Sequence, residues 1–195
     1  MNGIIRTVRN LIFATAAMLA SGLVAAAPAM AQASPAGYNM DEVIQTGHQF
    51  FGTTSGSLAQ VVERAFQSYG LPNGYILGEE AAGAFFGGLR FGEGTLFTKN
   101  AGQHRIFWQG PSLGFDVGGD GARTMMLVYD LPAVEAVYGR FGGVSGSAYL
   151  IGGLGMTVLT RDNIVLVPVK TGVGARLGVN LGYLKLTPMP TWNPF

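Results

Sequence analysis

Glycine recurs through most of this chain in a pattern that limits how it can fold. Between Gly78 and Gly182 the sequence places 23 of its 31 glycines, singly or in pairs, among Phe, Leu, Val and Tyr. A Gly/Ser linker carries few apolar residues, whereas here a residue that favours burial follows each glycine within a few positions. The pattern therefore indicates short strands that bend tightly around a small core.

From Tyr75 onward, period-2 alternation and turn residues replace helical periodicity. The predicted strands lie near residues 75–78, 83–91, 94–99, 104–108, 112–118, 122–129, 146–159, 164–170 and 173–186. Within the last of these, strand parity puts Gly174, Gly178 and Gly182 on one nearly bare face. We predict a mainly β fold, a small soluble antiparallel β-barrel with two or three short helices, the N-terminal helices packing on the barrel.

Helix signals flank or interrupt these strands. Asn39 is predicted to cap a first helix, and a capping box at Ser57 and a C-terminal Gly70 bound a second. Asp130, followed by a proline in the first turn, is predicted to cap a third that runs to about Tyr138. The sequence thus predicts one barrel domain over residues 40–187, after a flexible segment at 32–39 and before a Pro-rich tail at 188–195.

The first 31 residues have the features of a secretory signal. Arg6 and Arg9 form a basic region, residues 11–27 are apolar, and Ala29-Met30-Ala31 matches the small-x-small pattern of a signal peptidase site. We predict cleavage after Ala31, with an uncleaved anchor helix as the alternative. The chain has no cysteine, so disulfides and a lipoprotein anchor are excluded. Export without disulfides favours the periplasm of a Gram-negative cell.

The charge balance argues against nucleic acid as a partner. The chain has 12 Lys and Arg against 11 Asp and Glu, and two of the arginines lie in the predicted signal. The mature chain is therefore close to neutral, without the basic patch that binding to phosphate backbones needs.

The sequence offers little that points to catalysis or a metal. The two histidines, His48 and His104, are far apart in the chain. Ser147 stands where a nucleophile elbow needs its second glycine, and the glycine clusters lack the context of phosphate loops. Asp116 to Gly121 is better read as a turn than as a calcium loop. We expect no enzymatic activity, no metal and no cofactor.

Paired acids do not indicate a glycosidase either. Glu79 and Glu80 are adjacent, so on a strand their side chains point to opposite faces. We expect one of them to form a surface salt bridge with Arg90 across a strand pair.

Aromatic and methionine side chains are more numerous than a narrow barrel can easily enclose. If some of them line an open mouth, the site would suit a lipid or another amphipathic ligand. The candidate lining residues are Phe97, Phe107, Trp108, Phe115, Met125, Tyr129 and Tyr149.

Three segments resemble the envelope integrity protein A family of exported alphaproteobacterial proteins, formerly a domain of unknown function. They are Gly74–Ala81, Gly87–Leu96 and Trp108–Asp116, the last being the most specific. The resemblance covers about Met40 to Pro188. It implies a small soluble periplasmic β-barrel needed for envelope integrity, with no catalytic residues to transfer. A weaker likeness links residues 110–129 and 172–186 to SYLF-type lipid-binding domains.

We therefore expect a non-catalytic periplasmic protein that supports the cell envelope by binding a lipid, a peptidoglycan-associated component or an envelope protein. Peripheral contact with a membrane and the oligomeric state stay open. One alternative is a small outer-membrane β-barrel, although Gly, Arg and Asn on the outward face of the last predicted strand argue against it. The other is an enzyme with a scattered site, in which Glu93, His104 or Asp116 would be essential.

Overall fold

The computed structural model describes residues 37–52, 56–83, 88–111, 122–144, 147–171 and 182–193, all within a compact unit that spans Pro35–Phe195. The predicted signal, most of the flexible segment at 32–39, the predicted strand at 112–118 and most of that at 173–186 lie outside these residues. Gly174 and Gly178, which strand parity places on one face with Gly182, also lie outside them.

Two helices precede the strands, α2 (Met40–Phe51) and α3 (Gly56–Tyr69). The predicted cap at Asn39 is confirmed: its side chain accepts from the Glu42 backbone N–H at 2.9 Å, and the Glu42 carboxylate accepts from the Asn39 N–H at 2.8 Å. The C-terminal residue Gly70 has φ 75° and donates to Phe66, also as predicted. The prediction of Ser57 as the cap of α3 is wrong, because the helix begins at Gly56, two residues before the start that such a cap implies.

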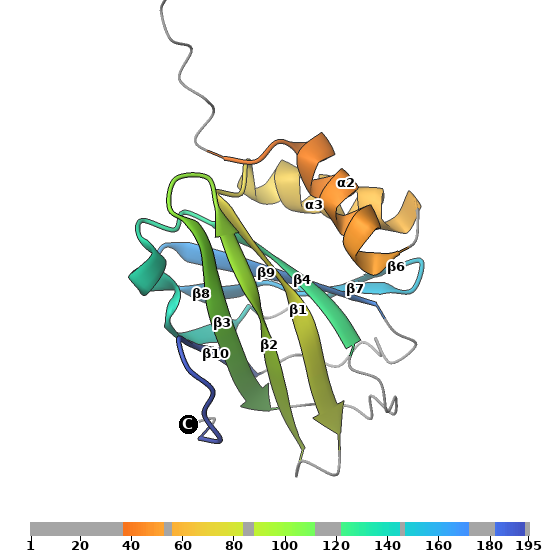
Figure 1. Ribbon diagram of the computed structural model, residues 1–195. Coiled ribbons are helices and arrows are strands. Elements are labelled where there is room, and N and C mark those ends of the chain that lie inside the picture. Colours follow the sequence, from red (N-terminus) through yellow and green to blue (C-terminus); the bar gives the residue numbers. More distant parts are fainter. Residues whose placement is uncertain are drawn as a thin grey trace, which may run out of the picture. The chain divides into compact units, whose positions relative to one another are not determined.

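Eight of the described strands close into an antiparallel β-barrel (Figure 1), in the order β4-β1-β2-β3-β10-β5-β8-β9, with β9 pairing back to β4. The short strands β6 and β7 extend the sheet from the far end of β9. The bounds are β1 Gly74–Gly83, β2 Leu89–Thr98, β3 Gly102–Pro111, β4 Ala122–Tyr129, β5 Gly139–Gly143, β6 Tyr149–Ile151, β7 Leu154–Met156, β8 Leu159–Arg161, β9 Ile164–Thr171 and β10 Tyr183–Thr187. The predicted fold class, a mainly β antiparallel barrel with N-terminal helices, is confirmed.

Several predicted strand limits are wrong. β1 continues through Glu79 and Glu80 to Gly83, and the predicted break at Gly78 is a point of close strand contact instead of a turn. The predicted strand at 146–159 contains two short strands, β6 and β7, separated by a turn at Gly152-Gly153, both at positive φ, and its last residue begins β8. β5 was not predicted at all, because its sequence is largely glycine and carries almost no apolar alternation.

The third helix differs from the prediction. Only a short 3-10 helix, η2 (Val134–Val137), forms, and Asp130 is not its cap, since it adopts a left-handed conformation at φ 55°. Asn73 fixes this segment, donating to the Leu131 carbonyl at 2.8 Å and accepting from its N–H at 3.1 Å. These bonds let Leu131 and Val137 reach into the barrel core.

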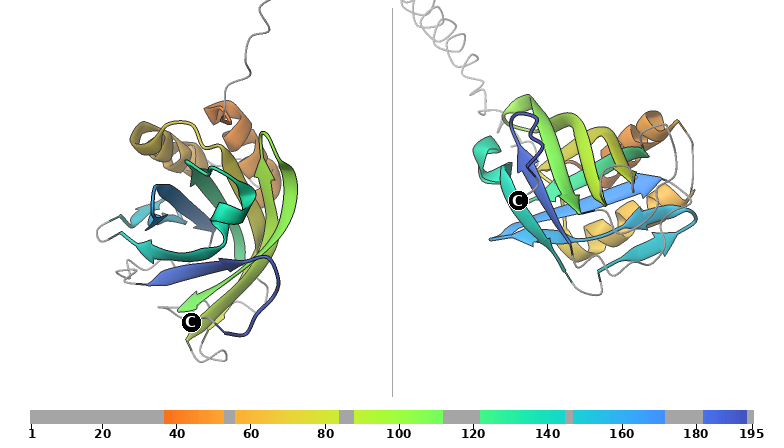
Figure 2. Two further views of the ribbon diagram at one scale, coloured as in Figure 1. Left: turned by 90° about the vertical axis from the view of Figure 1, so that its left-hand side faces the viewer. Right: turned by 90° about the horizontal axis from the view of Figure 1, so that it is seen from below.

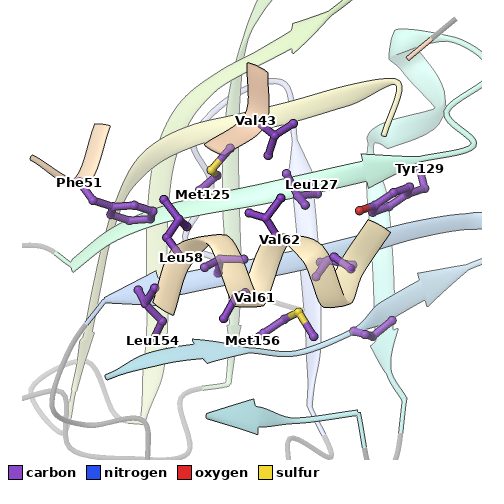
Figure 3. Close-up of a cluster of buried hydrophobic side chains, with 14 residues drawn as sticks. Val43, Phe51, Leu58, Val61, Val62, Met125, Leu127, Tyr129, Leu154 and Met156 are labelled. Atoms are coloured by element: carbon purple, nitrogen blue, oxygen red, sulfur yellow. The ribbon is translucent and has the colours of Figure 1, made fainter. Parts of the chain in front are cut away.

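Helices α2 and α3 lie against the outer face of β4, β9 and β7 (Figures 1 and 3). Side chains alternate along β4, so that Met125, Leu127 and Tyr129 meet the helices while Met126 and Val128 point into the barrel. The helix-side core comprises Val43, Phe51, Leu58, Val61, Val62, Ala65, Met125, Leu127, Tyr129, Leu154, Met156, Val158, Val167 and Val169. No helix in the described part of the chain is long and apolar enough to span a membrane.

A second core fills the barrel itself. It comprises Ile76, Leu96, Ile106, Trp108, Met126, Val128, Leu131, Val137, Phe141, Leu159, Ile164, Leu166, Leu184 and Leu186, which we call the barrel core. Its largest member is Trp108, and glycines make room for the ring: a Cβ on Gly92 would overlap the indole, and one on Gly78 would lie 2.7 Å from its Cη2 atom. The interior-facing glycines of β1 and β2 are thus required by one tryptophan and by close strand approach.

Candidate functional site

A buried carboxylate lies inside the barrel, beside the barrel core. Glu80 is 3% exposed, and its two carboxylate oxygens accept from the Trp108 indole N–H at 2.8 Å and from the Lys170 ammonium. Burial alone would raise the pKa of Glu80, but the charges of Lys170 and Arg90 and the two hydrogen bonds outweigh it and hold the pKa below its usual value. Glu80 is therefore ionised at neutral pH, and it joins strands β1, β3 and β9 across the interior.

The predicted surface pairing of Glu79 or Glu80 with Arg90 is wrong about the location, because the carboxylate beside Arg90 is buried inside the barrel. Glu79 and Glu80 do point to opposite faces, as expected, and Glu80 points inward. Arg90 adds a charge beside Glu80 inside the barrel and donates to the Tyr183 carbonyl at 3.5 Å. The main partner of Glu80, Lys170, lies 90 residues away in the sequence.

A groove of about 720 Å³ lies on the other side of the same strands, over the outer face of β1, β2 and β3. The outward side chains there are apolar at Ala81, Phe91 and Phe107, and polar at Glu79, Glu93, Arg105 and Gln109. Pro190, Thr191 and Trp192 complete the wall. We call this site the outer groove.

The chain after β10 supplies that wall, and we call residues 188–193 the C-terminal strap (Figure 2). Thr187 Oγ1 donates to the Met189 carbonyl at 2.8 Å, and Lys185 Nζ donates to the Asn193 carbonyl at 3.2 Å. The Trp192 ring lies 5.2 Å from that of Phe91, centroid to centroid, yet remains 82% exposed. The strap thus holds a large, mostly solvent-exposed ring at the edge of the outer groove.

The groups that would serve an enzyme have local structural partners. His104 Nε2 lies 2.9 Å from the Ala101 carbonyl, and Glu93 pairs with Arg105 at 3.0 Å. Ser147 donates to the Val144 carbonyl at 2.6 Å and accepts from the Val158 N–H at 3.2 Å. Asp116 lies outside the described residues. Among those residues, no group of three or more His, Asp or Glu side chains gathers in a way that could hold a metal ion.

Comparison with known proteins identifies the family. The model of envelope integrity protein A matches residues 36–195. The chain belongs to this family. It is also similar to a crystal structure of a β-barrel-like, uncharacterised protein from Brucella abortus, at 66% sequence identity and a TM-score of 0.77, over 82% of this chain and 99% of that one. No match was found among the curated proteins.

The segments that resemble envelope integrity protein A supply the residues that pack around Trp108 and Glu80 inside the barrel. Gly74–Ala81 is most of β1 and supplies Gly78 and Glu80, Gly87–Leu96 supplies Gly92, and the specific segment begins at Trp108. The segments that carry the resemblance therefore contain the glycines, tryptophan and carboxylate that pack together inside this barrel.

The predicted ligand-lining residues do not share one site in this member of the family. Trp108 is in the barrel core, while Met125 and Tyr129 are in the helix-side core. Phe97 stacks on Tyr75 with ring centroids 4.9 Å apart, and Tyr149 lies under Arg64 at 5.0 Å. Of the set, only Phe107 and Trp108 line the outer groove, and Phe115 lies outside the described residues.

Lys170, Gln109 and Trp192 are among the site residues that sequence reasoning missed. Lys170 could have been found from parity, because Ile164 and Leu166 of β9 face the barrel core and Lys170 continues the same face. Nothing local marks Gln109 or Trp192 as groove residues, since they come together only through the path of the strap.

Proposed function

We propose that this member of the envelope integrity protein A family is a non-catalytic periplasmic protein that binds an amphipathic envelope component, a lipid in the first place, in the outer groove. The family match establishes the role in envelope integrity. Binding and the periplasmic location are our inference from the site and from the predicted export signal.

The outer groove is the observation that carries this proposal. Its volume falls in the range of ligand pockets, roughly 300–1,000 Å³. It places the apolar rings of Phe91, Phe107 and Trp192 beside carboxylate, guanidinium and amide groups. Such a lining suits a ligand with both an apolar body and a polar head.

The barrel interior is a less suitable place for a lipid. Lipid-carrying barrels keep a cavity along their axis, whereas buried side chains, including Trp108 and Phe141, occupy the described interior here. A ligand there would have to displace a core that also stabilises the fold. The outer groove requires no such change.

The location can be tested by osmotic extraction. We expect the mature protein to be released with the soluble periplasmic fraction, because charged residues such as Glu93 and Arg105 occupy outward positions of the barrel and the helices cover much of the rest. Immunoblots of the osmotic, cytosolic and detergent fractions measure it. Recovery only in detergent would support an integral outer-membrane barrel and contradict the proposal.

Ligand binding can be tested on protein purified from the periplasm. Native mass spectrometry is expected to show an added mass in the range of a lipid, and Trp192→Ala should lose it while the melting temperature stays within a few degrees, because the ring is mostly exposed. Protein that is always free of ligand and also takes up no fluorescent fatty acid would refute lipid binding.

A further inference from the structure

Two acidic side chains of the outer groove lie opposite each other, so their charges repel when the groove holds no ligand. Glu79 and Glu93 are direct cross-strand partners on the outward face of β1 and β2, a position where like charges destabilise a sheet. Arg105 neutralises Glu93 at 3.0 Å. Glu79 has no ion-pair partner among the described residues, and Arg123, opposite it on β4, instead donates to the Phe50 carbonyl at 2.9 Å. The outward charged side chains of the groove, two carboxylates and one guanidinium, therefore leave an excess of one negative charge.

A buried amide supplies a second and independent sign of a ligand. Gln109 lines the same groove and is 1% exposed, yet its Nε2 atom donates to no acceptor among the described residues. A buried donor without a partner destabilises the folded state, because it has lost its hydrogen bonds to water. An oxygen acceptor on a bound molecule would remove that destabilisation.

The strap adds an apolar element of the kind found at membrane surfaces. Trp192 is 82% exposed and Met189 is 71% exposed, so both present large apolar side chains to solvent next to the groove. Tryptophan is favoured at the boundary between head groups and acyl chains because its ring is apolar and its N–H is polar. These side chains suit an acyl region next to a head group held in the groove.

We propose that the outer groove recognises the ammonium-bearing zwitterionic head group of a membrane phospholipid. The ammonium lies against Phe91 and Trp192 and is attracted by Glu79, because aromatic faces and a carboxylate both favour an organic cation. The head-group oxygens accept from Gln109. Trp192 and Met189 contact the acyl region. This inference rests on the proposed lipid-binding function and specifies the head group.

Vesicle co-sedimentation tests the head-group preference. The full mature protein is expected to bind phosphatidylcholine vesicles more tightly than phosphatidylglycerol vesicles, and glycerophosphocholine should compete. Glu79→Gln should weaken binding to phosphatidylcholine by about threefold to tenfold. The matched control Glu135→Gln removes an exposed carboxylate on η2, outside the groove, and should leave binding unchanged.

Tryptophan fluorescence tests the role of the strap. The chain has two tryptophans, and because Trp108 is fully buried, a blue shift on adding phosphatidylcholine vesicles reports Trp192. Trp192→Ala should abolish the shift and weaken binding by about tenfold or more.

The possible outcomes separate this inference from the proposed function. Head-group recognition would be overturned by equal binding to both vesicle types or by the absence of any effect of Glu79→Gln, and lipid binding would then remain. It would also be overturned if a trilysine peptide competed as well as glycerophosphocholine, and cation binding would then remain. Failure to bind either vesicle type or fatty acid would overturn both.

Discussion

Replacing Glu80 with glutamine is expected to lower the free energy of unfolding by about 3 kcal/mol at neutral pH. Glutamine has nearly the same shape and can still accept from the Trp108 indole, so the effect isolates the charge. Its loss removes the carboxylate that accepts from Lys170 and that balances the charge of Arg90 beside it. We use the low end of the usual range for breaking a buried ion pair because the Lys170 side chain is 25% exposed. Urea denaturation measures the change.

Glu79→Gln is the matched control, since it removes the same charge from the adjacent residue on the opposite, solvent-facing side of β1. It should change stability by less than about 0.5 kcal/mol. Equal effects of the two substitutions would show that the interior pair contributes nothing specific.

The difference between the native protein and Glu80→Gln should depend on pH with a definite sign. The pKa of Glu80 is lower in the folded state than in the unfolded chain, where a Glu titrates near roughly pH 4.3. The stabilisation is therefore fully present above that pH and is lost as the pH falls through the folded pKa. A difference that grew on acidification would contradict this assignment.

Replacing Gly92 with alanine is expected to destabilise the barrel by about 1–3 kcal/mol, towards the upper end, even though alanine normally suits a strand better than glycine. A Cβ at this position would overlap the indole atoms of Trp108, which is fully buried and hydrogen-bonded to Glu80 and so has no free space to move into. Thermal and urea unfolding measure the loss. Gly142→Ala is the control, because in the described part of the chain no atom beyond its two chain neighbours lies within 4 Å of a Cβ on this β5 glycine.

A double-mutant cycle identifies the cause of that loss. Trp108→Leu is itself destabilising, because it removes much of the largest side chain of the barrel core. In that background, Gly92→Ala should cost much less than in the native protein. If the two losses simply add, the overlap with the ring is not the reason for glycine at position 92.

Local sequence signals predicted the elements whose causes are also local. The capping of α2 by Asn39, the end of α3 at Gly70 and the opposite directions of Glu79 and Glu80 all follow from a few neighbouring residues. The strand predicted at 122–129 has the same limits in the structure, for the same reason. β5 was missed because a run of glycines gives no apolar alternation to detect.

The sites depended on pairings between distant strands. Gly92 faces Trp108 only because β2 and β3 pair in one register, and Glu80 meets Lys170 only because β4 connects β1 to β9. A shift of one residue in either pairing would reverse which side chains face inward. Parity alone could therefore separate Glu79 from Glu80 without saying which one was buried.

By itself the sequence determined a glycine-rich antiparallel barrel, its two N-terminal helices and its resemblance to the envelope integrity protein A family, because alternation, caps and turn residues act over a few positions. The tertiary structure alone decided that the interior glycines of β1 and β2 make room for Trp108, that the barrel is filled around Glu80, and that Trp192 borders a groove on the opposite face. Those features arise from contacts between segments up to about a hundred residues apart, whose free energy depends on the closed sheet and is absent from any single segment.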